Sequence, residues 1–416
     1  MQQRPNDGSG NGGNGGNGGN SGNSGNGGAG RRPFAAEEVL PRPHPSSTLS
    51  APLRIAVLMG GANSERYASL SSGVAIARAL RWVGHAVAAV DSAQAPIVAD
   101  RRVDHAFLTA EVEQEDIPET PVSPTVAIPP DLDALAEVRS RQEDGVMAPG
   151  VLPILAAADV VFVTTFGDEG EMGNSQRYLE QHAIVYTGPT PEVCDLTFDK
   201  VRTKEVITEH GIDTPAWHLV RRDRIEEDLR ELTLPAPWIV KPHAGGSTIG
   251  LSKVDDPAQL PAACRLAIAE GRDALIEEFV PGRDLTIAAL GDRVFAIVEP
   301  LSDHEVFSYE AKYTPGESRK EVPANLSPED TARVRRLTGQ VHQVLGIGEA
   351  TSRADFRLAA DGRLVFLETN PLPGMTPRSS YPMSAAAEGV SFPELCEDIV
   401  VRALRRAGRS VAEPQG

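Results

Sequence analysis

The pattern of apolar runs and a helical segment that begins at residue 53 restricts the fold of this 416-residue chain more than any other feature. An apolar run at 53–59 ends in Gly60 and Gly61, a helix is expected from about Ser69, and a second apolar run covers 86–90. Strand, helix and strand in this order are typical of a βαβ unit, in which the two strands run parallel. We therefore predict an α/β first domain with a glycine turn at the end of its first strand.

The chain is too long for one compact core, and it fits two or three domains and a tail. Residues 1–50 are predicted to be a disordered tail, because their first thirty residues are mostly Gly, Asn and Ser. The first domain is expected at 51–188, with an insertion rich in Pro, Asp and Glu at about 95–150. A smaller central unit follows at 189–277, and a last domain of strands and helices at 278–412.

Composition excludes several classes of function. The formal net charge of −18 repels nucleic acid and anionic lipid alike, so neither nucleic acid nor a membrane is expected as a partner. No apolar run approaches the length that crosses a bilayer, and the first thirty residues lack the apolar core of a signal peptide. The three cysteines, Cys194, Cys264 and Cys396, form no CxxC pair, which favours a reduced, cytoplasmic location without zinc.

The strongest chemical signal is a predicted hairpin at 351–370 with an Asp-Gly turn. Because side chains alternate along a strand, Arg353 and Asp355 share one face, and Glu368 and Asn370 share a face of the returning strand. If these faces coincide, two carboxylates and an amide oxygen converge, and such an all-oxygen set suits Mg²⁺. The alternative is a solvated hairpin face without a ligand.

A second signal is Lys241, which ends an apolar strand and precedes the glycine-rich segment 243–250. Glycines let backbone N–H groups approach phosphate oxygens, and the lysine adds a positive charge. The segment does not match the P-loop pattern, and a plain turn after a strand is the alternative.

Two further segments have a functional and a structural interpretation each. The acidic strand at 277–284 either pairs its backbone edge with adenine while a carboxylate binds the ribose, or is an amphipathic strand with an exposed acidic face. The segment 308–316, with two tyrosines, a lysine and a Pro-Gly pair, either closes over a site or is a surface loop with aromatic anchors.

In this order, the four segments resemble the D-alanine–D-alanine ligase family of the ATP-grasp superfamily, over roughly residues 53–405. The resemblance implies an α/β fold of three domains, the N-terminal βαβ domain and two ATP-grasp subdomains, with ATP between the last two. It implies a ligase that uses ATP and Mg²⁺, or Mn²⁺ in its place, to join two small amino acids through an acyl phosphate. The expected product is the D-alanine dipeptide of peptidoglycan synthesis. The resemblance leaves open whether the protein forms a homodimer.

The resemblance also implies roles on the nucleotide side. Two carboxylates and an amide look like the Mg²⁺ ligands, three lysines look like phosphate contacts, and two acidic residues occupy the adenine and ribose positions. The family usually has Glu where Asp284 stands, a shortening by one methylene. In that order the residues are Asp355, Glu368 and Asn370; Lys200, Lys241 and Lys312; and Glu277 and Asp284.

On the amino-acid side, Glu65 matches the residue that holds the ammonium of the first amino acid, in a hydrogen-bonded trio with Ser247 and Tyr313. Arg353 matches the arginine that steadies the acyl phosphate and the tetrahedral intermediate. The positions that hold the carboxylate of the second amino acid are Gly374, Ser379 and Ser380.

One motif departs from the family pattern. The His-Gly-x-x-Gly-Glu-x-Gly segment of the family appears here as 166–173, with Phe166 in place of the histidine. The alternative is therefore a related carboxylate–amine ligase that makes a different dipeptide, for example in natural-product biosynthesis. A non-catalytic nucleotide-binding protein and a kinase without ligation are further alternatives, and retention of both metal carboxylates, Lys241 and Arg353 argues against the former.

Overall fold

The structure is a computed structural model, and its chain divides into two units, Met1–Phe34 and Ala35–Gly416. Only the second unit is described below. The described residues are 47, 49–94, 106–107, 136–137, 139–140, 142, 145–246, 250–269, 272–302 and 318–410.

The first sheet confirms the predicted βαβ opening. Strands β1 (Arg54–Met59) and β2 (Ala86–Asp91) pair in parallel, joined by α1 (Arg66–Trp82), and β3 (Val160–Val163) pairs in parallel with the other edge of β1. The strand order is β2-β1-β3. Helix α1 begins three residues before the predicted Ser69, so that its first turn lies directly after the glycine turn.

The segment that follows β3 differs from the prediction at one point. A strand was expected at 184–187, but the chain forms a single parallel bridge there, between Val161 and Tyr186. The end of the predicted insertion belongs to the core, because Met147 and Ala148 are buried beside β1 and β3. The helices of this part are α3 (Val151–Ala156), α4 (Gly167–Gly170), α5 (Asn174–Gln181) and α6 (Pro191–Phe198).

A second, antiparallel sheet has the order β4-β7-β5-β6. Strand β7 therefore lies inside the sheet, and both of its backbone edges are paired. These pairings end at Glu278, so the prediction that the backbone of the segment 277–284 pairs with adenine stays open only for the residues after Glu278. The strands are β4 (Trp217–Val220), β5 (Trp238–Pro242), β6 (Ser252–Val254) and β7 (Ala274–Glu278), and the helices are α7 (Lys200–Glu209), α8 (Ile225–Glu231), η3 (Pro257–Gln259) and α9 (Leu260–Ile268).

The third sheet, with the order β10-β9-β8-β11-β12, contains the predicted hairpin. Its turn has Gly362 at a φ of +84°, a backbone conformation that glycine adopts without strain. The strands are β8 (Gly282–Leu290), β9 (Arg293–Ser302), β10 (Ser318–Glu321), β11 (Thr351–Ala359) and β12 (Leu364–Asn370), and the helices are α11 (Pro328–Val344), α12 (Ser380–Ala386) and α13 (Phe392–Arg406).

The two faces of the third sheet pack against different partners. Ile287 of β8 and Ala354 of β11 belong to an apolar cluster with α11. The next residue along β8, Ala288, belongs to a cluster that includes α12 and α13. Because neighbouring residues point to opposite faces, Arg353 and Asp355 lie on the face away from α11. The predicted site of the hairpin therefore lies on that face.

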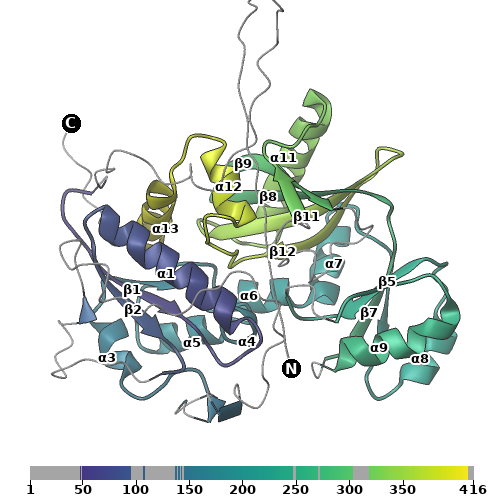
Figure 1. The fold of residues 1–416 in the computed structure, drawn as a ribbon, viewed down its shortest axis with the longest axis horizontal. Coiled ribbons are helices and arrows are strands. Elements are labelled where there is room, and N and C mark those ends of the chain that lie inside the picture. Colours follow the sequence, from purple (N-terminus) through teal and green to yellow (C-terminus); the bar gives the residue numbers. More distant parts are fainter. Residues whose placement is uncertain are drawn as a thin grey trace, which may run out of the picture. The chain divides into compact units, whose positions relative to one another are not determined.

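The last helix packs on the first sheet, although it follows the third sheet in the chain. Figure 1 shows α13 beside α1, and both contribute to one apolar cluster with β1 and β3. Below this cluster, His85 donates from Nε2 to Glu397 on α13, and Ser47 donates to the same carboxylate. The folded part therefore begins before residue 50, where the tail was predicted to end.

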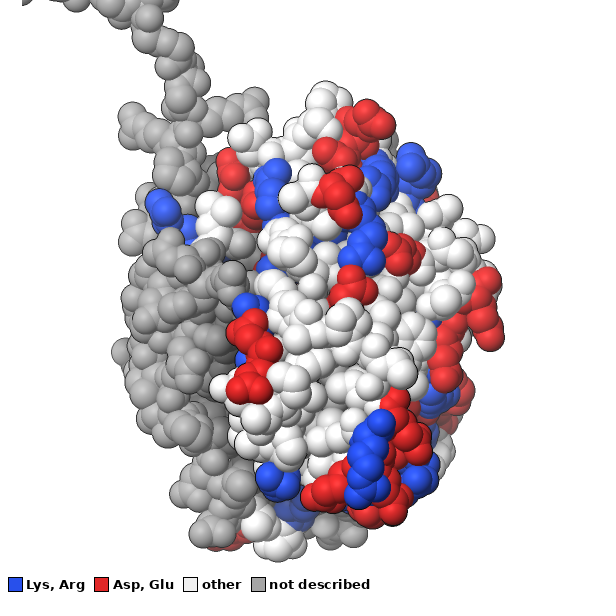
Figure 2. Space-filling model, turned by 90° about the vertical axis from the view of Figure 1, so that its right-hand side faces the viewer, with Lys and Arg blue, Asp and Glu red and all other residues white. Residues whose placement is uncertain are grey.

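The surface carries charges of both signs. On the face shown in Figure 2, acidic and basic side chains lie next to one another at the rim and leave broad uncharged surface between them. Exposed ion pairs such as Arg224 with Glu227 on α8 are part of this pattern, and each contributes little to stability. Among the helices of the described residues, none has the length and apolar character needed to cross a membrane.

One buried histidine predicts how stability depends on pH. His342 of α11 donates from Nε2 to the Gly348 carbonyl at 2.7 Å and accepts from Ser352 of β11 at Nδ1, which is the neutral tautomer. Burial lowers the pKa of His342 below its usual value. As the pH falls below about 6.5, the unfolded chain binds this proton and the folded chain does not, so stability is lost. We expect the unfolding midpoint to fall between pH 7 and pH 5, less so in His342→Gln.

The matched control is His210→Gln, because His210 is exposed at the end of α7. That variant should keep the pH dependence of the wild type in thermal melts at pH 5, 6 and 7. An equal slope in all three proteins would contradict the role of His342.

Candidate functional site

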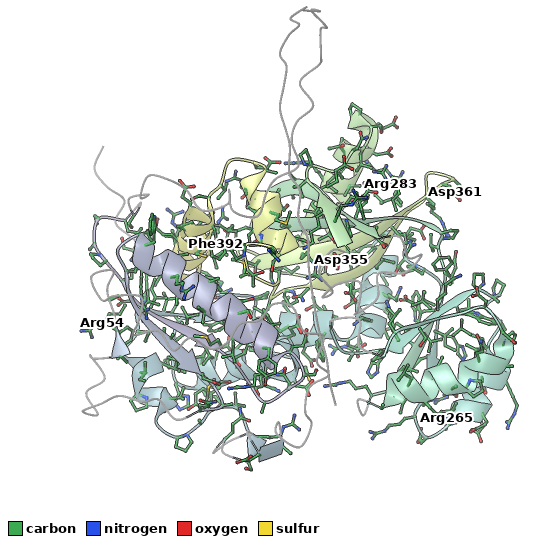
Figure 3. The ribbon with its side chains drawn as sticks, in the orientation of Figure 1. Arg54, Arg265, Arg283, Asp355, Asp361 and Phe392 are labelled. Carbon is green, nitrogen blue, oxygen red and sulfur yellow. The ribbon has the colours of Figure 1, made fainter. Side chains whose placement is uncertain are left out.

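The two polar faces of the hairpin coincide, as the alternation of its strands predicted. In the β11–β12 register, Arg353 lies opposite Asn370 and Asp355 lies opposite Glu368. A β-bulge follows directly, so that Phe356 pairs with Phe366. In Figure 3 Asp361 marks the turn of the hairpin, and Asp355 lies further back along β11. The predicted carboxylates are therefore neighbours across the two strands.

Asp355 is held in place by two neighbours. Arg353 donates to it from Nη2 at 2.9 Å, and Thr286 of β8 donates from its hydroxyl at 2.7 Å. Burial of Arg353 lowers its pKa, but the charges of Asp355, Glu368 and Glu171 outweigh burial and raise the pKa of the guanidinium. Arg353 thus stays cationic next to the carboxylates.

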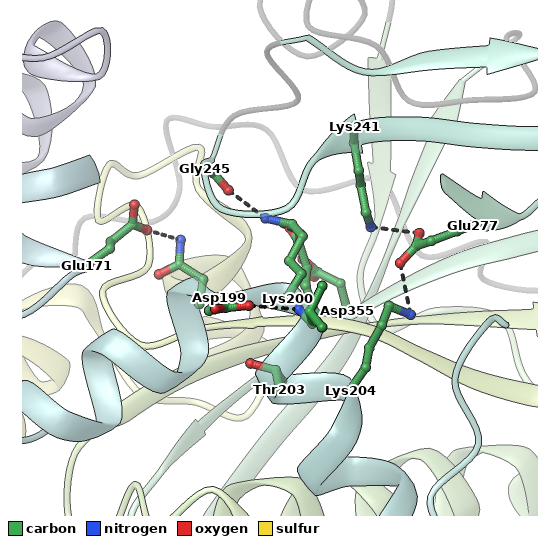
Figure 4. A network of polar contacts seen from close by, with 12 residues as sticks. Glu171, Asp199, Lys200, Thr203, Lys204, Lys241, Gly245, Glu277 and Asp355 are labelled. Atoms are coloured by element: carbon green, nitrogen blue, oxygen red, sulfur yellow. Dashed lines mark hydrogen bonds and ion pairs between the residues drawn. The ribbon is translucent and has the colours of Figure 1, made fainter. Parts of the chain in front are cut away.

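The central sheet provides a second charged group, which is buried. The Glu277 carboxylate lies between two lysines, 2.8 Å from Lys204 Nζ and 2.8 Å from Lys241 Nζ, as Figure 4 shows. Burial of Glu277 opposes its charge, but the two lysines outweigh burial and lower its pKa. The three side chains carry one net positive charge in a place with little water.

A third lysine connects the glycine-rich segment with the hairpin. Lys200 Nζ donates to the Gly245 carbonyl at 2.6 Å and lies 3.5 Å from Glu368. Its backbone N–H donates to His243, and Asp199 forms a bridge with Ala244. Asp199 also caps the start of α7, which carries Lys200 and Lys204. Figure 4 shows Lys200 and Gly245 in one network of polar contacts with Lys204, Lys241 and Glu277.

The acidic strand at 277–284 is explained by neither of the two sequence interpretations alone. Glu277 is 2% exposed, so it is not part of an exposed acidic face. Asp284, at the predicted ribose position, lies 3.2 Å from Arg357, and burial raises its pKa. Asp284 stands two residues before Thr286 on β8 and opposite Arg357 of β11, so it lies on the same face of the third sheet as Asp355.

Glu65 lies at the start of α1, directly after the glycine turn. Its backbone N–H is bound by the Asn63 side chain at 2.9 Å. Its carboxylate lies against the glycine-rich segment, because a Cβ on Gly246 would come within 2.8 Å of Glu65 Oε2. Glu65 thus reaches the neighbour of its predicted partner Ser247. Ser247, Lys312 and Tyr313 themselves lie outside the described residues.

The segment 166–173, which departs from the family pattern, contacts the hairpin through Glu171. Glu171 accepts from Asn370 Nδ2 at 2.6 Å and from the Gly167 N–H at 2.9 Å. Burial, together with the charge of Glu65, raises the pKa of Glu171 to about 8. Asn370 accepts at its amide oxygen from the Leu372 N–H, which orients that oxygen at the end of β12.

Phe166 points into the core. Its ring is 5% exposed and belongs to an apolar cluster that includes Leu372 of the loop after the hairpin. A cavity of about 10 Å³ beside the ring has room for at most one water molecule. The replacement of histidine by phenylalanine therefore changes the packing below the loop at 371–376.

That loop carries Gly374, and the other two predicted acceptor positions, Ser379 and Ser380, follow it. Ser379 accepts from the Thr376 N–H at 3.1 Å and contacts the Thr376 hydroxyl at 2.8 Å. A Cβ on Gly374 would lie 3.1 Å from Ser379 Oγ, so the glycine allows the loop to fold onto this serine. Ser380 begins α12. The Met375 N–H donates to Ser72 of α1, which ties the loop to the first domain.

The donor set fits the proposed ligands. Asp355, Glu368 and Asn370 supply oxygens only, which suits Mg²⁺, an ion that usually takes one or two protein carboxylates and completes its shell with water and phosphate. Among the described residues, no group of three or more His, Cys, Asp or Glu side chains is placed to enclose a metal. Lys200 and Lys241 lie where they could balance the charge of a polyphosphate.

Sequence reasoning missed three residues of this arrangement. Lys204 follows Lys200 by four positions, which places both on one face of α7 and was the available signal. Glu171 was noted only as part of its motif. No pattern could have indicated Thr286, because its contact with Asp355 depends on the pairing of β8 with β11.

Comparison with known proteins agrees with this geometry. The family model described as "D-ala D-ala ligase N-terminus" matches residues 54–189, and "D-ala D-ala ligase C-terminus" matches residues 206–401. The chain belongs to the D-alanine–D-alanine ligase family. The two matched ranges include the glycine turn, Lys241 and the hairpin, whereas Lys200 and Lys204 lie in the stretch between them, at 190–205.

Two family members illustrate the degree of similarity. The D-alanine–D-alanine ligase of Anaeromyxobacter sp. is 33% identical over 85% of this chain and 98% of its own length. That of Cereibacter sphaeroides is 36% identical over 83% of this chain and 94% of its own length.

Solved structures support the three-domain ATP-grasp fold. The VanG D-Ala:D-Ser ligase of Enterococcus faecalis superposes with a TM-score of 0.64 at 23% identity, over 85% of this chain and all of that one. The D-alanine–D-alanine ligase of Bacillus anthracis in complex with ATP superposes with a TM-score of 0.60 at 22% identity, over 86% of this chain and 99% of that one.

Proposed function

We propose that this protein is an ATP-dependent ligase that joins two molecules of D-alanine, in the cytoplasm, for peptidoglycan precursor synthesis. The observation that carries the proposal is the hairpin, with Asp355 opposite Glu368 and Arg353 opposite Asn370, beside the lysines of α7 and β5. Family membership supports the same activity, since the relatives bear the name D-alanine–D-alanine ligase. ATP use is supported by the Bacillus anthracis ligase, which was solved with ATP.

In the first step, the carboxylate of the donor amino acid attacks the γ-phosphorus of ATP, and an acyl phosphate and ADP form. Lys200 and Lys241 neutralise charge on the phosphate oxygens, and Arg353 orients the acyl phosphate. A Mg²⁺ ion held by Asp355, Glu368 and Asn370 supplies further charge neutralisation at the phosphates when it is bound.

In the second step, the amine of the acceptor attacks the activated carbonyl, and inorganic phosphate leaves. Arg353 is the cation placed to stabilise the oxyanion that forms in this attack. Water competes with the amine for the acyl phosphate, so the site must exclude bulk water during the reaction. Glu65 binds the ammonium of the donor, and the Gly374, Ser379 and Ser380 loop binds the carboxylate of the acceptor.

The buried ring of Phe166 favours a second candidate for the acceptor. It packs under the loop at 371–376, which carries Gly374 and leads to Ser379 and Ser380, so a changed loop position would change acceptor choice. The alternative is a ligase of the same chemistry that makes a different dipeptide, for example with D-serine, which the VanG enzyme joins to D-alanine.

Phosphate release from ATP across paired amino acids separates these candidates. The wild type is supplied with Mg²⁺ or Mn²⁺, D-alanine as donor, and D-alanine, D-serine, glycine or the L-amino acids as acceptor, and the dipeptide is identified by mass. D-alanyl-D-alanine as the main product supports the proposal. Phosphate release without any dipeptide would indicate a kinase, and no release would contradict a ligase.

Loss of the donor's ammonium partner should be visible in the same assay. We expect Glu65→Ala to raise the KM for the donor, or to lower kcat, by about tenfold or more, because a partly enclosed cation loses its counter-charge. Glu192→Ala is the control, because Glu192 is an exposed carboxylate on α6. An unchanged donor KM and kcat in Glu65→Ala would show that Glu65 does not bind the substrate.

A further inference from the structure

The motif at 166–173 contains a second buried carboxylate that the proposed mechanism does not use. Glu169 of α4 is 6% exposed. Its Oε1 accepts from the Ala62 N–H at 2.5 Å and from Gln142 Nε2 at 3.4 Å, and its Oε2 accepts from the Ser92 hydroxyl at 2.9 Å. Burial raises the pKa of Glu169, and these three donors oppose that shift. A carboxylate is costly here, which suggests that its contacts serve a purpose.

What Glu169 holds is the glycine turn after β1. A Cβ on Gly61 would come within 2.8 Å of Glu169 Oε2, so the carboxylate lies directly on this backbone. Gly60 and Gly61 have φ values of +88° and +95°. Because glycine restricts its own backbone little, the conformation of the turn depends on contacts with residues outside it. The Ala62 carbonyl is bound from the other direction by Arg139 at 3.1 Å.

The same motif holds the next residue of the turn. Asn63 donates from Nδ2 to the Phe166 carbonyl at 2.9 Å, and its Oδ1 accepts the backbone N–H of Glu65. The α4 segment therefore contacts the turn at Ala62 and at Asn63, and the turn leads directly into Glu65. Because the Glu65 carboxylate lies against Gly246, a displaced turn would move it away from the glycine-rich segment.

We propose that Glu169 is a positioning residue for the donor site, which acts by fixing the turn at 60–63 and thereby the Glu65 carboxylate. The inference rests on the proposed function, because it assigns Glu65 to the ammonium of the donor. Glu169 also accepts from Ser92, which follows β2, and from Gln142. Through these bonds the first sheet is linked to the binding of the amino acid. Glu169 itself does not touch the substrate.

The test measures the donor alone. Hydroxylamine replaces the acceptor amine and attacks the acyl phosphate, which yields a hydroxamate and inorganic phosphate, so the rate reports donor KM and kcat. We expect Glu169→Ala to raise the KM for D-alanine by about tenfold, because the Ala62 N–H of the turn, Ser92 and Gln142 lose their acceptor, with a smaller change in the KM for ATP. Glu169→Gln keeps one acceptor oxygen and should restore most of the donor affinity.

The matched control is Glu397→Ala. Glu397 is also a buried carboxylate with two side-chain partners, His85 and Ser47, and it lies on α13 away from the site. It should lower the melting temperature as Glu169→Ala does, and leave the donor KM unchanged. Equal donor KM values in both alanine variants would overturn the positioning role.

A milder variant keeps the inference testable if Glu169→Ala does not fold. Ser92→Ala removes one contact of Glu169 and leaves the Ala62 contact in place, so we expect a rise of about threefold in donor KM. An unchanged donor KM in Ser92→Ala would contradict the inference. A wild type that forms no hydroxamate from any donor would instead contradict the proposed function.

Discussion

Glu368→Gln is expected to lower phosphate release from ATP to below about one-hundredth of the wild-type rate and to leave the fold intact. Changes in groups that only support metal ligands already cost about 10- to 100-fold, and Glu368 is proposed as a ligand itself. The variant loses one of the two carboxylates that face each other across the hairpin. Stability should change little, because the side chain is about one-third exposed and its ion pair with Lys200 is 3.5 Å long.

Asp361→Asn is the control for this experiment, because it removes a carboxylate from the turn of the same hairpin. Asp361 accepts the Arg363 N–H at 2.9 Å, which the amide oxygen of Asn can replace. Both variants should melt within a few degrees of the wild type. Activity near wild type in Glu368→Gln at saturating Mg²⁺ would refute the metal assignment.

Glu277→Gln is expected to lower the free energy of unfolding by about 3 to 5 kcal/mol, the usual cost of removing one partner from a buried ion pair. The carboxylate forms ion pairs with Lys204 and Lys241, which are 0% and 7% exposed, and without it two buried ammonium groups repel each other. ATP affinity should fall as well, because Lys241 loses the group that orients it. Urea unfolding measures the first effect, and nucleotide titration measures the second.

Glu278→Gln provides the matched control on the same strand. Glu278 is about one-third exposed and pairs with Arg363, so its loss should cost less than about 1 kcal/mol. In the Glu277→Gln background, Lys204→Met should recover part of the stability, because it removes one unpaired charge. Equal stability of the Glu277→Gln and Glu278→Gln variants would show that the buried trio does not stabilise the fold.

The four segments of the site differ in how far local pattern predicts them. The hairpin could be predicted because strand alternation and the Asp-Gly turn are properties of adjacent residues. The observed register of β11 and β12 agrees with that prediction. The structure narrows the adenine interpretation of 277–284 to the backbone after Glu278, because β4 and β5 pair with both edges of β7 up to that residue. Which edges of a strand are free depends on partners far away in the sequence, so no periodicity within the strand reveals it.

Glu277 illustrates the same limit for side chains. Its carboxylate was assigned by motif to the nucleotide, and the structure shows that it also forms ion pairs with two lysines, from α7 and β5. Phe166 is a similar case, since the motif gives only its residue type and the packing places its ring in the core. A motif gives the residue type at a position, and the environment of that residue decides its charge and direction.

By itself, the sequence determined the βαβ opening, the hairpin with its polar face, the order of the segments and the family, because hydrophobic period, turn residues and motif spacing are local properties. Only the tertiary structure decided which of these groups meet. The contacts of Glu277 with Lys204, of Glu171 with Asn370 and of Glu169 with Ala62 join residues that are far apart in the chain. Such contacts follow from how sheets and helices pack on one another, and packing depends on the whole set of side chains at once.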